Sequence, residues 1–128
     1  MEKSLFKSLK PVFFTKEIQE TVDFYSKILG FKVNAFDPEI GWAALAKDNI
    51  EIMLSIPNVH FPFTDSKFTG TIYFEITHID DFWEKVNTVA KICYPIETFD
   101  YGMREFAIFD NNGYILQFGE EVVSPDFS

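Results

Sequence analysis

The chain is poor in basic residues, with 11 Lys and Arg against 20 Asp and Glu and a formal net charge of −9. Nucleic-acid phosphates need a basic surface, so this balance argues against a nucleic-acid partner. The same balance is compatible with attraction of cationic ligands. An acidic surface that serves solubility alone is the alternative.

Cysteine is almost absent, and the single residue, Cys93, excludes an internal disulfide. It lies in a strand-like stretch between Ile92 and Tyr94, where we expect an inert buried side chain. No stretch approaches the roughly 20 apolar residues of a membrane-spanning helix, and the opening MEKSLFKSLK lacks the apolar run of a signal peptide. The expectation is a cytoplasmic protein with no membrane partner.

Aromatic residues are abundant, with 16 Phe, 5 Tyr and 2 Trp in 128 residues. A chain of this length fits one domain that buries roughly two-thirds of its unfolded surface, and its apolar content of 47% is ordinary for a globular protein. The rings exceed what one small core needs, so some of them are expected to line a pocket or an interface. A Phe-rich core is the alternative.

The order of the expected elements is repeated along the chain. From Pro11 a strand, a helix and three strands follow one another, and the same order begins again at Thr71. Thr15 and Thr77 stand at matching strand-to-helix junctions, 62 positions apart and so about half the chain. The repeat predicts an α+β fold in which two tandem βαβββ modules form a curved mixed sheet around a cavity.

The two modules are expected to form a single domain over residues 1–128. The first module spans about 10–57, a linker about 58–69, and the second module about 70–121. Apolar residues at helical spacing predict a helix that Gly30 ends.

Local signals predict the turns and one helix start. Asp48-Asn49 predicts a hairpin between two strands. Asn112-Gly113 predicts a second hairpin, because both residue types tolerate positive φ. Thr77 followed three residues later by Asp80 resembles a capping box at the second helix, with Asp in place of the usual Glu.

Two carboxylates lie on the faces of strands opposite the apolar residues. Glu51 alternates with Ile50 and Ile52, and Glu75 alternates with Phe74. If the helices cover the apolar faces, both carboxylates point toward the concave side of the sheet. Burying an unpaired carboxylate costs several kcal/mol, so we expect that side to contain water or a ligand. Strands that simply face solvent are the alternative. With a raised pKa, either carboxylate could also act as a general base.

Two segments carry a family resemblance. With the repeated βαβββ pattern, FYSKILGF in the first half and FDNNGYILQF in the last hairpin make the chain resemble the vicinal-oxygen-chelate superfamily, which includes glyoxalase I, extradiol dioxygenases and fosfomycin- and bleomycin-resistance proteins. The bleomycin-resistance branch is the most similar, through PVFFTKEIQETVDFYSKILGF and MREFAIFDNNGYILQF, although Tyr114 replaces the Asn of that turn. That resemblance implies a homodimer that exchanges N-terminal strands about a hinge at Pro11. It also implies acidic, aromatic crevices at the dimer interface that sequester a ligand.

The same superfamily implies a divalent metal held by His and Glu at four strand positions. Projected onto this chain, those positions fall on Lys10, Glu51, Thr71 and Gln117. Only Glu51 is a strong ligand, whereas a catalytic site needs about three. The two histidines, His60 and His78, are expected to be ordinary surface or capping residues. We therefore expect no metal and no cofactor.

The resulting hypothesis is a metal-independent, dimeric small-molecule binding protein. Its candidate ligand-binding residues supply stacking rings, negative charge and the start of a crevice-lining strand: Phe36, Trp42, Glu51, Tyr73, Glu75, Tyr101, Met103 and Arg104. For Arg104, an internal ion pair with a carboxylate is the alternative. A lyase- or dioxygenase-like enzyme with a degenerate metal site, and a metabolite binder without a resistance role, stay open as alternative functions.

Overall fold

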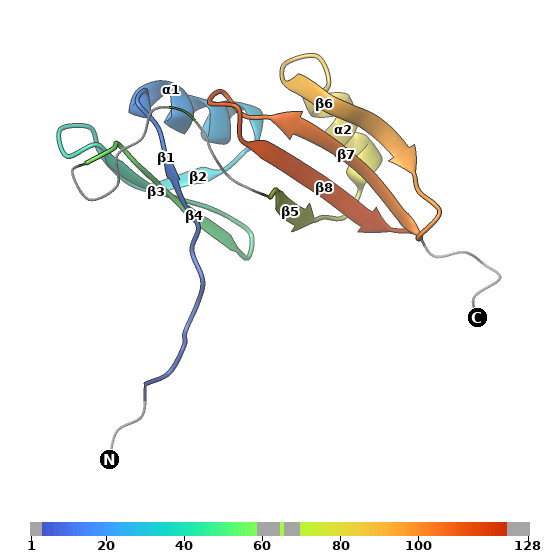
Figure 1. The fold of residues 1–128 in the computed structure, drawn as a ribbon, viewed down its shortest axis with the longest axis horizontal. Coiled ribbons are helices and arrows are strands. Elements are labelled where there is room, and N and C mark those ends of the chain that lie inside the picture. The colour runs from blue at the N-terminus through green and yellow to red at the C-terminus, as the bar shows by residue number, and fades with distance from the viewer. Residues whose placement is uncertain (1–3, 59–64, 66–69, 123–128) are drawn as a thin grey trace. The chain divides into compact units, whose positions relative to one another are not determined.

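The computed structural model describes residues 4–58, 65 and 70–122, which fall in two compact units, Met1–Thr64 and Asp65–Ser128 (Figure 1). The first unit contains β1 (Val12–Phe14), α1 (Ile18–Asp23), a π-helical turn (Phe24–Ile28), β2 (Lys32–Asp37), β3 (Trp42–Lys47) and β4 (Ile50–Ser55). The second contains β5 (Ile72–Glu75), α2 (Ile79–Val86), β6 (Lys91–Thr98), β7 (Met103–Phe109) and β8 (Ile115–Glu121).

Both units have the same sheet topology, with strand orders β1-β4-β3-β2 and β5-β8-β7-β6. The first and last strand of each unit pair in parallel, and the remaining neighbours pair antiparallel. Two mixed four-stranded sheets built from βαβββ units confirm the predicted fold class. Their elements fall within the predicted module ranges. The predicted linker lies almost wholly outside the described residues, as does His60.

The spacing of the repeat differs by one residue from the prediction. Helices α1 and α2 begin at Ile18 and Ile79, which are 61 positions apart. The backbone N–H of Thr15 donates to Ser55 after β1, and that of Ile76 donates to Gly119 after β5. The structural counterpart of Thr15 is therefore Ile76, not Thr77.

The first helix is shorter than its apolar spacing predicts, because α1 passes into the π-helical turn after Asp23. Gly30 ends it with φ +84°, as predicted. Tyr25, on the π-helical turn, is fully buried and packs against Phe13 and Phe31, with ring centroids 6.0 and 5.8 Å away. These rings anchor the helix to its sheet.

In the second unit, α2 covers one face of the sheet. Ile79 and Val86 of the helix are fully buried. Trp83 packs edge-on against Phe106 of β7, with ring centroids 5.0 Å apart. The ring centroids of Phe82 and Phe118 of β8 are also 5.0 Å apart. Many of the phenylalanines thus belong to the cores, as the Phe-rich alternative has it.

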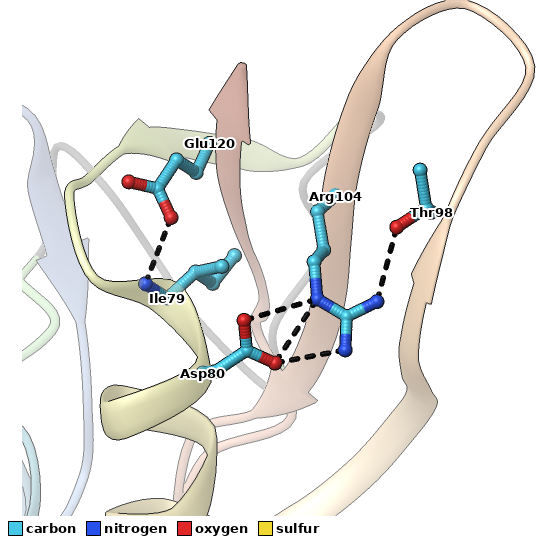
Figure 2. A network of polar contacts seen from close by, with 5 residues as sticks. All are labelled: Ile79, Asp80, Thr98, Arg104 and Glu120. Atoms are coloured by element: carbon cyan, nitrogen blue, oxygen red, sulfur yellow. Dashed lines mark hydrogen bonds and ion pairs between the residues drawn. The ribbon is translucent and has the colours of Figure 1, made fainter. Parts of the chain in front are cut away.

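The start of α2 does not use the predicted capping box. The N-cap residue is His78, whose left-handed backbone (φ +54°) makes no side-chain cap. Glu120 of β8 instead accepts hydrogen bonds from the N–H groups of His78 and Ile79 at 3.0 and 3.1 Å. Asp80 is unavailable for the box because Arg104 binds its carboxylate (Figure 2).

Both predicted hairpins are present. Asp48 turns the first with φ +51°, and Gly113 turns the second with φ +95°. Asn112 keeps a negative φ, since the carboxylate of Asp110 accepts its N–H at 2.8 Å and fixes a different turn.

The expectation of a buried Cys93 is wrong. β6 is an edge strand whose burial alternates, so that Ile92 and Tyr94 are half-buried and Cys93 is exposed. Pro95 has no backbone N–H to donate to a further strand, and the pairing of β6 with β7 shifts register twice. Both features are compatible with an edge strand. In the described part of the chain, no helix is long and apolar enough to cross a membrane.

Candidate functional site

The face of the second sheet opposite α2 carries a buried carboxylate. Along β7, Phe106 packs toward the helix, so Glu105 and Ala107 point to the other face. Glu105 is only 4% exposed.

Three tyrosine hydroxyls donate hydrogen bonds to Glu105. Tyr73 of β5 donates to Oε2 at 2.5 Å, and Tyr101, in the β6–β7 turn, donates to Oε1 at 2.6 Å. Tyr94 of β6 makes a longer contact with Oε1 at 3.4 Å. The carboxylate is thus surrounded by phenols from three parts of the unit, an arrangement that we call the Glu105 cluster.

Side chains of β8 extend the Glu105 cluster. Gln117 donates from Nε2 to the Tyr94 hydroxyl at 2.9 Å and accepts a short hydrogen bond from Thr71. The register aligns Tyr73, Gln117, Ala107 and Tyr94 in one row across the sheet. Because alanine fills the middle of the row, the large side chains at its two ends have room to converge.

Gly119 makes room for Tyr73. A Cβ atom at Gly119 would lie 1.8 Å from the Tyr73 hydroxyl oxygen and 2.6 Å from the ring carbon that bears it. Gly119 is in register with both Glu75 and Glu105, so the Tyr73 ring crosses it to reach the carboxylate. Any larger residue at 119 would therefore displace Tyr73.

Further aromatic rings adjoin the carboxylate. Tyr101 stacks on Phe99 with ring centroids 5.5 Å apart and planes 5° from parallel. Phe99 also meets Tyr94 edge-on at 6.0 Å. Tyr101 is 66% exposed and Tyr73 is 43% exposed, so these rings are accessible from solvent.

The carboxylate holds its tyrosines in the protonated form. The hydrogen bond to Glu105 raises the pKa of Tyr101 to about 12. Burial, with the same carboxylate, raises the pKa of Tyr73 still further, and burial also raises the pKa of Tyr94. The three phenols thus act as hydrogen-bond donors rather than as acids at neutral pH.

The candidate residues of the first unit are not all on one face. Trp42 and Glu51 lie on the face opposite α1, both in half-buried or exposed positions. Phe36 is in register with Ala43, a fully buried residue on the face that carries α1. The structure therefore does not bring Phe36 together with Trp42.

In the second unit, Tyr73 and Tyr101 both donate hydrogen bonds to Glu105. Glu75 and Met103 are on the same face, and Glu75 is exposed. Arg104 points to the opposite face, where it binds Asp80 at 2.8 Å and Thr98 at 3.0 Å (Figure 2). Arg104 therefore forms the internal ion pair that was its alternative role. Its hydrogen bond also lowers the pKa of Asp80.

The positions implied to hold a metal do not fit one. Lys10 Nζ forms an ion pair with Glu51 Oε2 at 3.1 Å. Glu51, the one strong metal ligand among the four positions, is therefore already paired with an ammonium group. Thr71 and Gln117 hydrogen-bond to each other. Among the described residues, no cluster of three or more His, Cys, Asp or Glu side chains could hold an ion.

Sequence reasoning missed Glu105, Tyr94 and Phe99. The available signal was Glu105 itself, a carboxylate within a predicted strand, between Arg104 and the apolar stretch Phe106–Phe109. Its alternation with Arg104 and Phe106 would have placed it on the open face. Tyr101 is four residues from Glu105, in the turn before β7, whereas Tyr94 and Tyr73 are 11 and 32 residues away and reach Glu105 only because of the strand order.

Solved structures share the fold. A protein of unknown function from Agrobacterium tumefaciens is 16% identical with a TM-score of 0.78, covering 94% of this chain and 98% of its own. TioX from Micromonospora is 19% identical (TM-score 0.72; 90% and 100% covered), and a glyoxalase-related enzyme from Clostridium phytofermentans is 23% identical (TM-score 0.72; 95% and 100% covered).

A search of curated proteins gives no match to this sequence. The model of the Glyoxalase/Bleomycin resistance protein/Dioxygenase superfamily matches residues 9–118. That range covers the first βαβββ unit, the second as far as the middle of β8, and the Glu105 cluster. The chain therefore belongs to the Glyoxalase/Bleomycin resistance protein/Dioxygenase superfamily.

Proposed function

We propose that the protein is a cytoplasmic, metal-independent binding protein that sequesters a cationic or aromatic small molecule. The observation that carries this proposal is the Glu105 cluster: a buried carboxylate with three tyrosines on the open face of a sheet. Rings give large contact area at small entropic cost, and the carboxylate supplies a fixed negative charge.

The chemistry of the Glu105 cluster favours binding over catalysis. A general base needs free lone pairs, and three phenolic hydroxyls already donate to the carboxylate of Glu105, so they occupy most of its acceptor sites. The tyrosines are poor proton donors because their pKa values are raised. The pairing of Lys10 with Glu51 likewise opposes a metal-assisted reaction of the kind known in the superfamily.

A titration tests the proposal directly. The chain has two tryptophans, Trp42 on the open face of the first sheet and Trp83 in the core beneath α2. We expect a bleomycin-type glycopeptide to change tryptophan fluorescence equally with and without a chelator. The change should be lost in Tyr101→Leu, which removes one of the exposed rings of the Glu105 cluster. A response that the chelator removes, or a stoichiometric bound metal after purification, would contradict metal independence.

A homodimer with exchanged N-terminal strands completes the proposal. Residues 4–10 precede β1, and their apolar side chains Leu5, Phe6 and Leu9 are almost fully exposed. Large apolar groups in contact with water favour association, and a second copy that receives this segment beyond a hinge at Pro11 would cover them.

Removal of residues 1–9 tests the dimer while leaving β1 and the Lys10–Glu51 pair intact. We expect analytical ultracentrifugation to find a dimer for the full chain and a monomer or aggregates for the truncated chain. The triple variant Leu5→Ser, Phe6→Ser, Leu9→Ser, which keeps chain length, should behave like the truncation. A stable dimer in both variants would rule out the exchanged segment.

A further inference from the structure

The Glu105 cluster also indicates which kind of cation it suits. We propose that it binds a fully alkylated ammonium group, held against the rings of Tyr73 and Tyr101 with Glu105 as counter-charge. This inference rests on the proposed binding function and narrows the ligand class of the same site.

The charge of Glu105 is not neutralised within the described residues. The ion pairs found there join Lys10 to Glu51, Lys27 to Asp23 and Arg104 to Asp80. Arg104, the neighbour of Glu105 along β7, points to the other face of the sheet. A carboxylate that is buried without a cation is costly, so an incoming cation stabilises it.

The hydrogen bonds of Glu105 disfavour a primary ammonium group. Such a group carries three N–H donors that need acceptors when they leave water. Both carboxylate oxygens already accept phenolic protons, at 2.5 Å from Tyr73 and 2.6 Å from Tyr101. With Tyr94 as a third donor at 3.4 Å, the phenols occupy about three of the roughly four acceptor sites of the carboxylate, so the three N–H donors of a primary ammonium meet about one free site and compete with the tyrosines for the others.

A quaternary ammonium group has no donors to satisfy. It is attracted to the faces of aromatic rings, and this attraction grows when the site is desolvated. A phenol that donates to a carboxylate is polarised by it, which strengthens the negative face of the ring. The rings of Tyr73 and Tyr101 are both exposed enough to be reached, and stacking on Phe99 fixes the orientation of Tyr101.

Three matched probes test the ligand class by calorimetry: choline, its primary amine analogue ethanolamine, and its uncharged isostere 3,3-dimethylbutan-1-ol. We expect choline to bind about tenfold more tightly than either analogue. Equal or tighter binding of ethanolamine would overturn the preference for alkylation. Equal binding of the alcohol, or no binding of choline, would overturn the cation site.

Variants locate the effect at Glu105. Glu105→Gln, which keeps the shape of the side chain, should lose the preference for choline over the alcohol, whereas Glu84→Gln on the exposed side of α2 removes the same charge and should keep it. Tyr101→Phe should bind choline more tightly than Tyr101→Leu, because the ring remains. Tyr101 lies in an exposed turn, so this pair gives an answer even if Glu105→Gln misfolds.

Comparing the two ligands, and then the variants, separates this inference from the proposed function. If the glycopeptide still binds to the wild-type chain but choline does not, the binding function stands and the ammonium site is wrong. A loss of choline affinity in Glu84→Gln as large as in Glu105→Gln would also overturn the site, since overall charge would then explain it.

Discussion

The two units share a topology but differ in what their open sheet faces carry. The first unit has an ion pair between Lys10 and Glu51, with side chains 42% and 48% exposed. The second has Glu105, buried beneath tyrosines and without a basic partner among the described residues. An exposed pair contributes little to stability, whereas a buried charge makes strong demands on its surroundings. The two units therefore share a scaffold but carry different chemistry on their open faces.

The helices also begin differently. In the first unit the buried hydroxyls of Thr15 and Thr21 hydrogen-bond at 2.8 Å, and Thr15 also accepts the N–H of Glu17. In the second, the cap comes from Glu120 on a different element (Figure 2). The start of α2 thus depends on tertiary structure, while that of α1 is local.

The largest effect is expected at Gly119, the counterpart of Ser55 in the first unit. Gly119→Val should destabilise the protein by about 1–3 kcal/mol, because its side chain would occupy the space of Tyr73. Urea denaturation measures the change. Ser55→Val, at a half-buried position, is the matched control and should cost less.

A second substitution confirms the cause. Tyr73→Ala combined with Gly119→Val should recover part of the lost stability, since the conflicting ring is gone. Strictly additive effects of the two changes would mean that Gly119 matters for another reason.

Substitution of the two carboxylates compares the open faces directly. Glu105→Leu should cost about 1–3 kcal/mol, because it leaves phenolic donors without an acceptor. Glu51→Leu should cost less than about 1 kcal/mol, because it breaks an exposed ion pair. Chemical denaturation of both variants measures the difference, and equal costs would contradict the contrast drawn between the faces.

The cap of α2 should have an intermediate effect. Glu120→Ala removes the acceptor of two backbone N–H groups and should cost about 1 kcal/mol. Glu121→Ala, at the adjacent exposed residue, should be nearly neutral. Thermal unfolding of the two variants tests this prediction. Equal midpoint temperatures would mean that Glu120 does not stabilise the start of α2.

The smallest effect on stability is expected at alkaline pH. Because the pKa of Tyr101 is raised from 10.0 to about 12 by Glu105, its contribution is complete below pH 10 and is lost as pH rises through about 12. The ultraviolet absorbance of phenolate should therefore appear late in the wild-type titration. It should appear earlier in Glu105→Gln, and an unchanged titration would mean that the carboxylate is not the cause.

Periodicity and turn chemistry predicted the architecture, because the strands alternate cleanly and the hairpins carry strong local signals. Tyr73 and Tyr101 were predicted as ring candidates, yet their common partner Glu105 was not, because it depends on strand order. Asp80 and Cys93 misled for the same reason: one is bound by Arg104 from β7, and the other is exposed because β6 is an edge. Local sequence does not encode such long-range neighbours.

The close approach of Tyr73 to Gly119 constrains how the two halves could have diverged. Val12 and Ser55 occupy the corresponding places in the first unit, where neither residue obstructs the other. If the halves descend from one ancestral copy, glycine had to arise at position 119 before, or together with, the tyrosine at 73, because the reverse order passes through a clash. The double variant Val12→Tyr, Ser55→Gly would test whether these two substitutions are enough for a tyrosine ring to cross the sheet in the first unit as it does in the second.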